Sequence, residues 1–151
     1  MSSTPLPVPP TGYSLLHASP YLALVGPCYY AKDNNGVLSL GLFIQEKHVN
    51  AVGIGHGGLL TSLADASLGL AIYEVHPSSG PMVTASLSME FLEAARLGDW
   101  VETHVDIERI GKRISYANCF LHVGDRRILR ASGVFVSTPP QENARKLLSD
   151  S

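Results

Sequence analysis

The segment from Asn50 to Glu74 constrains the fold more than any other part of this chain. It begins with a loop that contains four glycines and one histidine between Gly53 and Gly58. From Leu59 it continues as the longest stretch with helical character, apolar and rich in alanine and leucine. Because glycine has no side chain, the first backbone N–H groups of this expected helix stay uncovered, at the positive end of the helix dipole.

A single carboxylate, Asp65, lies in the middle of this apolar segment. Small side chains surround it in the sequence, so another element can pack closely against the helix. Burying a charged group is costly unless the group is paired or takes part in chemistry. We therefore interpret Asp65 as a candidate catalytic residue. The alternative is a structural carboxylate that is paired with a cation of the core.

The composition of the chain excludes several classes of protein. A chain of 151 residues fits one domain, and its net charge of −2 without a basic segment argues against a nucleic-acid surface. Cys28 and Cys119 lie far apart and outside any metal-binding motif, so we expect reduced core residues. The N-terminus lacks the features of a signal peptide, and no apolar run approaches the roughly 20 residues of a membrane span. We therefore expect a soluble, cytoplasmic protein that needs no metal ion or cofactor.

Three parts are expected along the chain. Residues 1–11 are rich in proline, serine and threonine and are typical of a disordered arm. Residues 12–139 form one domain, because no internal repeat or linker divides them. Residues 140–151 form a tail, with a short helical pattern around Glu142 to Leu148.

Before the long helix, the pattern predicts a helical turn and a hairpin. Residues 13–25 predict one or two helical turns, interrupted by Pro20 and ending near Gly26. Residues 28–32 and 37–46 predict two strands, which the Asp-Asn-Asn-Gly sequence joins as a tight turn. In the second strand, four alternating aliphatic residues fall on one face: Leu38, Leu40, Leu42 and Ile44.

After the long helix, the chain predicts only strands, at residues 82–92, 100–109, 114–123 and 127–137. The first strand is expected to place these residues on one face: Val83, Ala85, Leu87, Met89 and Phe91. One helix cannot cover both faces of six antiparallel strands. The sequence therefore predicts an α+β fold in which a strongly curved antiparallel sheet of about six strands wraps around the helix. The uncovered surface and the sheet edge favour association with a second copy of the chain.

The motifs of the loop and helix resemble those of the PaaI-like acyl-CoA thioesterases. This hotdog-fold family includes enzymes of the phenylacetate type and of the 4-hydroxybenzoyl-CoA thioesterase type. The matching features are Asn50, the GIGHGG sequence at 53–58, Asp65, Thr84, the FLEAARLGDW sequence at 91–100 and the GKR sequence at 111–113. The resemblance extends over roughly residues 20 to 138, with a departure at Ala94-Ala95, where relatives often carry a proline. It implies a hotdog fold, thioester hydrolysis of an acyl-CoA, and active sites at the interface of a homodimer that pairs into a dimer of dimers.

The GIGHGG sequence also satisfies the GxGxxG pattern of dinucleotide-binding proteins, and Glu74 lies near the offset of a ribose-binding acid. That fold requires further βαβ units. No long helices separate the strands that follow Pro81, so we set the dinucleotide interpretation aside.

Helix geometry limits how one chain can perform the chemistry. Asp65 lies eight residues after Gly57, which corresponds to about 12 Å along a helix axis. A thioester carbonyl polarised by the Gly57 N–H is therefore out of reach of Asp65 on the same helix, because attack needs roughly 3 Å. We expect a two-fold dimer in which the two groups come from different chains.

Five residues form the expected catalytic set. Gly57 offers its N–H to the carbonyl oxygen, and Asp65 either attacks the carbonyl or deprotonates a water. The resemblance implies that Thr84 bonds Asp65 or the water, although a plain polar strand face is the alternative. Asn50 either holds the water or the substrate carbonyl, or caps its loop. His56 either contacts the substrate or only shapes the turn.

Substrate binding is the least constrained part of the sequence. Coenzyme A carries phosphates, so basic residues should surround the entrance of the site, and the family pattern favours Lys112 and Arg113, with Gly58 as a further substrate contact. Other candidates are Arg96, Arg126, Arg127 and Arg130, with ordinary solvated charges as the alternative for each. The acyl pocket is expected to use apolar residues such as Leu60, Ala64, Tyr29 or Tyr30. The sequence does not distinguish an aryl group from an alkyl chain.

Two functions from other classes remain open. A hotdog hydratase would use a His–Asp or His–Glu pair on an enoyl-CoA, but the usual surroundings of such a histidine are not recognisable. A non-catalytic acyl-CoA-binding module would keep the same fold without turnover, and no DNA-binding segment is attached to this chain.

Overall fold

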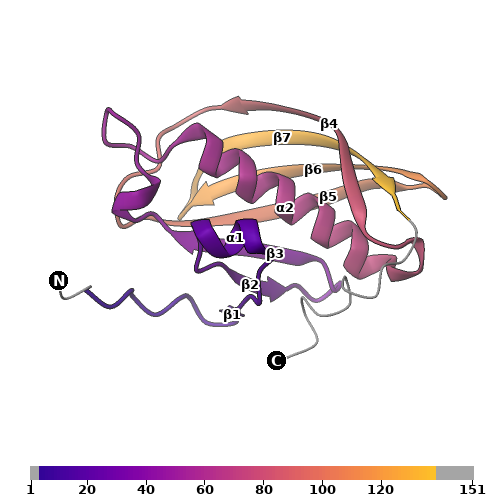
Figure 1. The fold of residues 1–151 in the computed structure, drawn as a ribbon, viewed down its shortest axis with the longest axis horizontal. Helices are drawn as coiled ribbons and strands as arrows, with labels where there is room; N and C mark the ends of the chain where they lie inside the picture. Colours follow the sequence, from indigo (N-terminus) through magenta and orange to yellow (C-terminus); the bar gives the residue numbers. More distant parts are fainter. Residues whose placement is uncertain (1–3, 139–151) are drawn as a thin grey trace.

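A computed structural model describes residues 4–138, and Figure 1 shows the fold. Within these residues, seven strands and two α-helices follow in this order: β1 (Ser14–Leu15), α1 (Pro20–Val25), β2 (Tyr29–Lys32), β3 (Leu38–Phe43), α2 (Gly57–Val75), β4 (Met82–Phe91), β5 (Trp100–Ile110), β6 (Ile114–Val123) and β7 (Arg126–Ser137). Short 3-10 helices, Glu46–His48 and Pro77–Ser79, precede and follow α2. The expected tail at 140–151 and its helical pattern lie outside the described residues.

The strands form one sheet in the order β1-β2-β3-β5-β6-β7-β4, and every neighbouring pair is antiparallel. Helix α2 crosses the concave face of this sheet, and α1 lies beside it (Figure 1). The predicted α+β hotdog architecture is therefore confirmed, with one strand more than expected. An all-antiparallel sheet also contradicts a dinucleotide-binding fold, which needs parallel strands.

Apolar spacing explains why α2 packs on the sheet. Its buried residues recur at three- and four-residue intervals: Leu59, Leu60, Leu63, Ala64, Ser67, Leu68, Ala71 and Ile72. The aliphatic residues expected on one face of β3 are all buried below them. Polar contacts also lie in this layer: Ser67 Oγ and Thr103 Oγ1 of β5 are 2.5 Å apart, and Thr103 Oγ1 accepts the Leu40 N–H at 2.8 Å. This network satisfies buried polar atoms and ties α2, β3 and β5 together.

The N-terminal region differs in detail from its prediction. The helical turns exist as α1, but Pro20 begins the helix rather than interrupting it. Ser19 caps α1, with its side chain accepting the Leu22 N–H, and proline is favoured at the first helical position because its missing N–H has no helical partner there. The two-residue strand β1 escaped prediction because so short a strand carries no alternation.

Strand β4 contradicts the predicted alternation. A bulge lies between Thr84 and Ser86, where the pairing with β7 shifts by one residue. A one-residue shift reverses the faces on either side of it. Val83 therefore points away from the helix and is 53% exposed, whereas Leu87 packs against the core.

Helix α2 has 19 residues with a mean hydropathy of 1.2, so among the described residues it alone is long and apolar enough, by length and composition, to cross a membrane. Asp65 and Glu74 interrupt this segment, so the sequence alone did not indicate an apolar run of membrane length there. The core helix of a folded domain meets the same criterion, and here one face of α2 is buried against the sheet.

Candidate active site

Asp65 lies on the half-exposed face of α2, on the side where the helix meets the edge strand β4. Residues three and four positions apart share a face of a helix, so Asp65 is grouped with Ser62, Ala66 and Gly69, all of which are half-buried. Neighbouring Ala64 belongs to the opposite face and is fully buried. The carboxylate therefore stays in contact with solvent although the helix itself is central to the fold.

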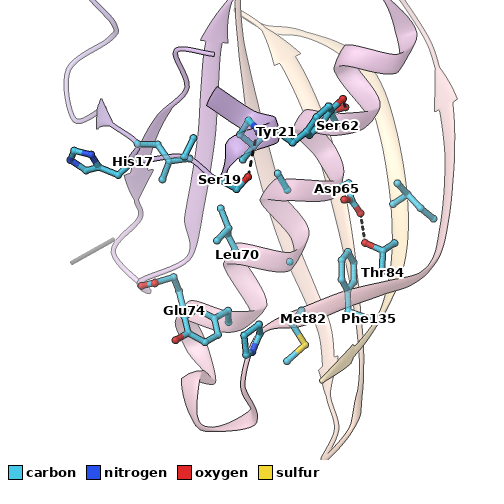
Figure 2. Close-up of a pocket in the computed structure, with 18 of the residues that line it drawn as sticks. His17, Ser19, Tyr21, Ser62, Asp65, Leu70, Glu74, Met82, Thr84 and Phe135 are labelled. Carbon is cyan, nitrogen blue, oxygen red and sulfur yellow. Dashed lines mark hydrogen bonds between the residues drawn. The ribbon is translucent and has the colours of Figure 1, made fainter. Parts of the chain in front are cut away.

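The partner of Asp65 is Thr84 on β4. The Thr84 hydroxyl donates a hydrogen bond of 2.5 Å to Asp65 Oδ1 (Figure 2). The bulge in β4 is what turns Thr84 toward the helix, so the alternative of a plain polar strand face is wrong for this residue. Within residues 4–138, Asp65 forms no ion pair, which contradicts the alternative of a carboxylate paired with a core cation.

A groove of about 700 Å³ opens over Asp65. Figure 2 shows its three walls: the segment that contains α1, the solvent-facing side of α2, and the strands β4 and β7. Along α2 it is lined by Thr61, Ser62, Asp65, Ala66, Gly69, Leu70, Tyr73 and Glu74. A groove of this size is typical of a small-molecule site.

The expected acyl-pocket residues lie elsewhere. Leu60 and Ala64 are buried under the sheet, on the face of α2 opposite to the groove. Tyr29 packs near the Trp100 ring, with ring centroids 5.9 Å apart, and Tyr30 packs against the core. None of these four residues lines the groove, so the groove itself gives them no role in an acyl pocket.

The start of α2 provides one free backbone donor. His56 caps the helix, and its Nδ1 accepts the Gly58 N–H at 2.8 Å. Among the described residues, the Gly57 N–H has no acceptor, since the intrahelical bonds begin with Leu59. His56 therefore acts as the turn-shaping histidine of the prediction, and Gly57 rather than Gly58 has an N–H available to a ligand.

Asn50 holds the glycine-rich loop in shape. Its Oδ1 accepts the N–H groups of Val52 and Ile54 at 3.1 and 3.3 Å, which is the loop-capping alternative. Its amide nitrogen forms no hydrogen bond within residues 4–138. The loop-capping role does not exclude a contact between this amide and a substrate.

The loop is also anchored by a residue that the sequence argument did not single out. His48 is 3% exposed. Its Nδ1 accepts the Gln45 N–H at 2.9 Å, and its Nε2 donates to the Val25 carbonyl at the end of α1. Burial lowers the pKa of His48 below its ordinary value, so the neutral form that these bonds require is favoured.

The predicted catalytic residues thus form two separate groups within one chain. Asp65 and Thr84 lie at the middle of α2, and Asn50, His56 and Gly57 lie at its start. The eight-residue separation corresponds to about 12 Å of helix, so the two groups do not meet on one chain.

The two cysteines provide no nucleophile. Both are buried and free. Burial raises the pKa of Cys28 to about 11 and that of Cys119 to about 12, which keeps both thiols protonated near neutral pH. This agrees with the expectation of reduced core residues.

The basic residues divide into paired and unpaired side chains. Arg126 pairs with Glu93 at 2.7 Å, Arg130 pairs with Glu90 at 3.1 Å, and Arg127 lies over the Phe120 ring, 4.0 Å from its centroid. Lys112 and Arg113 are exposed in the turn between β5 and β6, and neither forms an ion pair with any described residue.

Two contacts at the ends of the groove were not predicted. Tyr21 on α1 hydrogen-bonds Ser62 at 2.7 Å, and Lys32 on β2 forms an ion pair with Glu74 at 2.6 Å. Both join residues about 40 positions apart, so only the tertiary structure reveals them. The acid that resembled a ribose ligand is therefore a salt-bridge partner.

The sheet wrapped around one long helix defines a hotdog domain, with a carboxylate in an open groove and a free N–H at the start of the helix. Comparison with protein families gives the class. The model of the thioesterase superfamily matches residues 52–129, from the glycine-rich loop into β7. The chain is 42% identical over 127 residues to a Pseudomonas aeruginosa protein named "Putative esterase PA0474", covering 83% of this chain and 95% of that protein. The chain therefore belongs to the thioesterase superfamily.

Solved structures confirm the fold. The conserved protein PA5202 of Pseudomonas aeruginosa has a TM-score of 0.74 at 26% identity and covers 81% of this chain and 96% of its own. A hypothetical thioesterase of Streptococcus pneumoniae TIGR4, solved with coenzyme A, has a TM-score of 0.68 at 20% identity and covers 76% of this chain and 90% of its own.

Proposed function

We propose that this protein is an acyl-CoA thioesterase of the PaaI-like type, which hydrolyses an acyl-CoA to the free acid and coenzyme A. The observation that carries the proposal is the Asp65 carboxylate. It faces an open groove, is held by one hydroxyl and is not neutralised by a cation of the described residues. A carboxylate in that state is available to react, and the superfamily supplies the reaction class.

The Gly57 N–H is the proposed electrophilic group. As a thioester carbonyl is attacked, negative charge develops on its oxygen, and a fixed backbone donor at a helix N-terminus stabilises that charge. The missing side chain of Gly57 leaves room for the substrate to approach this N–H. The neighbouring Gly58 N–H is already bonded to His56 and supports the turn instead.

Asp65 can react by two routes. In one, a carboxylate oxygen attacks the carbonyl carbon, the coenzyme A thiolate leaves, and water hydrolyses the resulting mixed anhydride. In the other, the carboxylate takes a proton from a water, which attacks the carbonyl and expels the thiolate. In both routes the Thr84 hydroxyl donates its hydrogen bond to Asp65 Oδ1, and Asp65 Oδ2 is the oxygen that attacks or takes the proton.

A second copy of the chain would bring the two groups together. Strand β4 is at the edge of the sheet, and its outer side has no partner strand within residues 4–138. Exposed apolar side chains lie on and just after this edge: Val83, Phe91 and Leu92. A long edge strand of this kind favours antiparallel pairing with a second copy.

The contacts of β4 indicate where the two-fold axis would lie. Thr84 is bonded to Asp65, while the Phe91 ring lies against Gly57, where an added Cβ would be 3.3 Å from it. Antiparallel pairing centred between Leu87 and Ser88 sets residue 84 opposite residue 91 of the second copy. Asp65 of one chain would then approach Gly57 of the partner subunit, on both sides of the axis.

Coenzyme A binding rests on the fold and on the free cations. The Streptococcus pneumoniae neighbour was solved with coenzyme A, and the unpaired Lys112 and Arg113 lie at the end of the sheet that carries Thr84. We propose these two side chains as phosphate contacts. A hydratase mechanism is disfavoured, because among the described residues His56 has no carboxylate partner. The one His–Glu pair of these residues, His104 with Glu102 at 3.3 Å, does not line the groove.

The proposal is tested with Asp65→Asn, which keeps an oxygen for the Thr84 hydrogen bond but can neither attack nor accept a proton. We expect wild-type protein to release thiol from an acyl-CoA panel and kcat to fall by about 10²–10⁴-fold in the variant. Thiol release measures the rate, and thermal unfolding confirms the fold.

Asp65→Ala and Thr84→Val complete the series. Asp65→Ala should be as inactive as Asp65→Asn, while Thr84→Val should keep a measurable fraction of the rate, because it only removes a support for the carboxylate. Near-normal kcat in both Asp65 variants would exclude Asp65 as the reacting group.

A further inference from the structure

The groove is not uniform on the two sides of Asp65. Toward the start of α2, polar contacts narrow it: Ser62 Oγ donates to the Gly58 carbonyl at 2.9 Å, so its hydrogen bond with Tyr21 has the tyrosine as donor. Toward the end of α2, Figure 2 shows three apolar side chains on the walls: Leu70, Met82 and Phe135. An acyl group therefore gains burial on this second side.

Gly69 keeps this apolar side open. It lies four residues after Asp65, one helical turn along the same face. A Cβ at this position would meet the Phe135 ring at 3.5 Å and Met82 at 4.0 Å, both ordinary contacts. A methyl group therefore fits, while a longer side chain extends into the groove.

An ion pair lines the far end of the groove. Lys32 and Glu74 form their ion pair at 2.6 Å and line the groove beside Tyr73. Because each charge is already paired, this end offers no site for a charged or polar end of the acyl group. Tyr73 lies eight residues after Asp65, which corresponds to about 12 Å of helix.

We propose that the acyl group lies along α2 between Asp65 and the Lys32–Glu74 ion pair, and that Gly69 makes the protein selective for unbranched chains of about eight carbons. An extended chain advances about 1.3 Å per carbon, so about eight carbons fill the 12 Å once the ends are allowed for. The proposal depends on the proposed thioesterase function and specifies its substrate class.

The test compares acetyl-, octanoyl-, hexadecanoyl- and phenylacetyl-CoA with wild type, Gly69→Leu and Tyr73→Ala. In wild type, kcat/KM should be highest for octanoyl-CoA. Gly69→Leu should lower the octanoyl-to-acetyl ratio of kcat/KM by about 50-fold. Each buried methylene group of the acyl chain raises kcat/KM about fourfold, and the leucine side chain displaces about three of them. Tyr73→Ala should instead raise the hexadecanoyl-to-octanoyl ratio of kcat/KM, because it shortens a side chain at the far end of the groove.

The matched control is Ala23→Leu, which adds similar bulk at an exposed position of α1 outside the groove. Its octanoyl-to-acetyl ratio should equal that of wild type. Three outcomes would overturn the proposal: rates that keep rising to hexadecanoyl-CoA, a preference for phenylacetyl-CoA, or unchanged ratios in both groove variants. If Gly69→Leu does not fold, the hexadecanoyl-to-octanoyl ratio of kcat/KM in Tyr73→Ala tests the proposal by itself.

Ligand-induced thermal shifts separate this proposal from the function on which it depends. If no acyl-CoA releases thiol but octanoyl-CoA raises Tm in wild type and not in Gly69→Leu, the groove assignment stands and the hydrolase assignment fails. If thiol is released without dependence on chain length, the hydrolase stands and the groove assignment fails. If no acyl-CoA releases thiol and none raises Tm, both the hydrolase assignment and the groove assignment fail.

Discussion

Two adjacent N–H groups at the start of α2 have different partners, and this difference can be tested one residue at a time. Gly57→Pro removes the free N–H at the first helical position, where proline is well tolerated. The preceding His56 has φ −63° and ψ 133°, which suits a residue before proline. We expect kcat to fall by about 10²–10³-fold, the usual cost of removing one oxyanion donor, as measured by thiol release.

Gly57→Ala is the matched control, because it adds a Cβ in the same place and keeps the N–H. The new methyl group would lie 3.3 Å from the half-exposed Phe91 ring, which can move slightly. Its kcat should stay within about tenfold of wild type, as expected for a small packing change without loss of the donor. Equal losses in the two variants would show that crowding, and not the N–H, matters at this position.

At the scale of elements, one imidazole joins the loop before α2 to the end of α1. Since burial lowers the pKa of His48, the unfolded chain binds a proton more readily than the folded chain as the pH falls below about 6.5. The contribution of His48 to the free energy of unfolding should therefore be fully present above that pH and should decrease toward pH 5. His122, whose pKa burial also lowers, contributes in the same direction.

Urea unfolding at pH 7.5 and pH 5.0 measures this effect. His48→Gln should lower the free energy of unfolding at pH 7.5 by about 1–3 kcal/mol, because the Gln45 N–H and the Val25 carbonyl lose their buried partner. It should also reduce the difference between the two pH values. An unchanged pH dependence in His48→Gln would assign the effect to other groups.

At the scale of the whole molecule, the question is whether one chain or two complete the site. Asp65→Ala and Gly57→Pro should each be inactive alone, but a mixed dimer has one intact site if the site is shared. Random 1:1 pairing makes half of the dimers mixed, with one of two sites restored, so activity should recover to about a quarter of wild type. Co-expression with two affinity tags isolates the mixed dimer for thiol-release assays. A purified mixed dimer without activity would contradict a shared site.

The strongest local signals were correctly read from the sequence. The alternation of aliphatic residues in β3 and the apolar composition of the α2 segment reflect which side chains a strand or helix buries, and these are local properties. The glycine-rich loop predicted the start of α2, and the isolated Asp65 predicted a candidate catalytic carboxylate, whose reactivity stays a prediction. The resemblance carried by these features correctly indicated the thioesterase superfamily, and the PaaI-like subfamily stays a prediction.

The arrangement around Asp65 was decided by tertiary structure. The bulge that turns Thr84 toward the helix is a shift in pairing between β4 and β7. No residue of β4 predicts this shift from the sequence. The residues that line the groove also depend on the packing of the whole domain, and Leu60 and Ala64 are buried core residues outside it.

The ends of the groove show the same limit. Lys32 meets Glu74, and Tyr21 meets Ser62, across about 40 residues of chain. Local periodicity carries no information about such pairs. The sequence by itself thus determined most of the elements, the superfamily and the candidate carboxylate. The tertiary structure alone decided what surrounds that carboxylate, because long-range contacts form only when the sheet closes around α2.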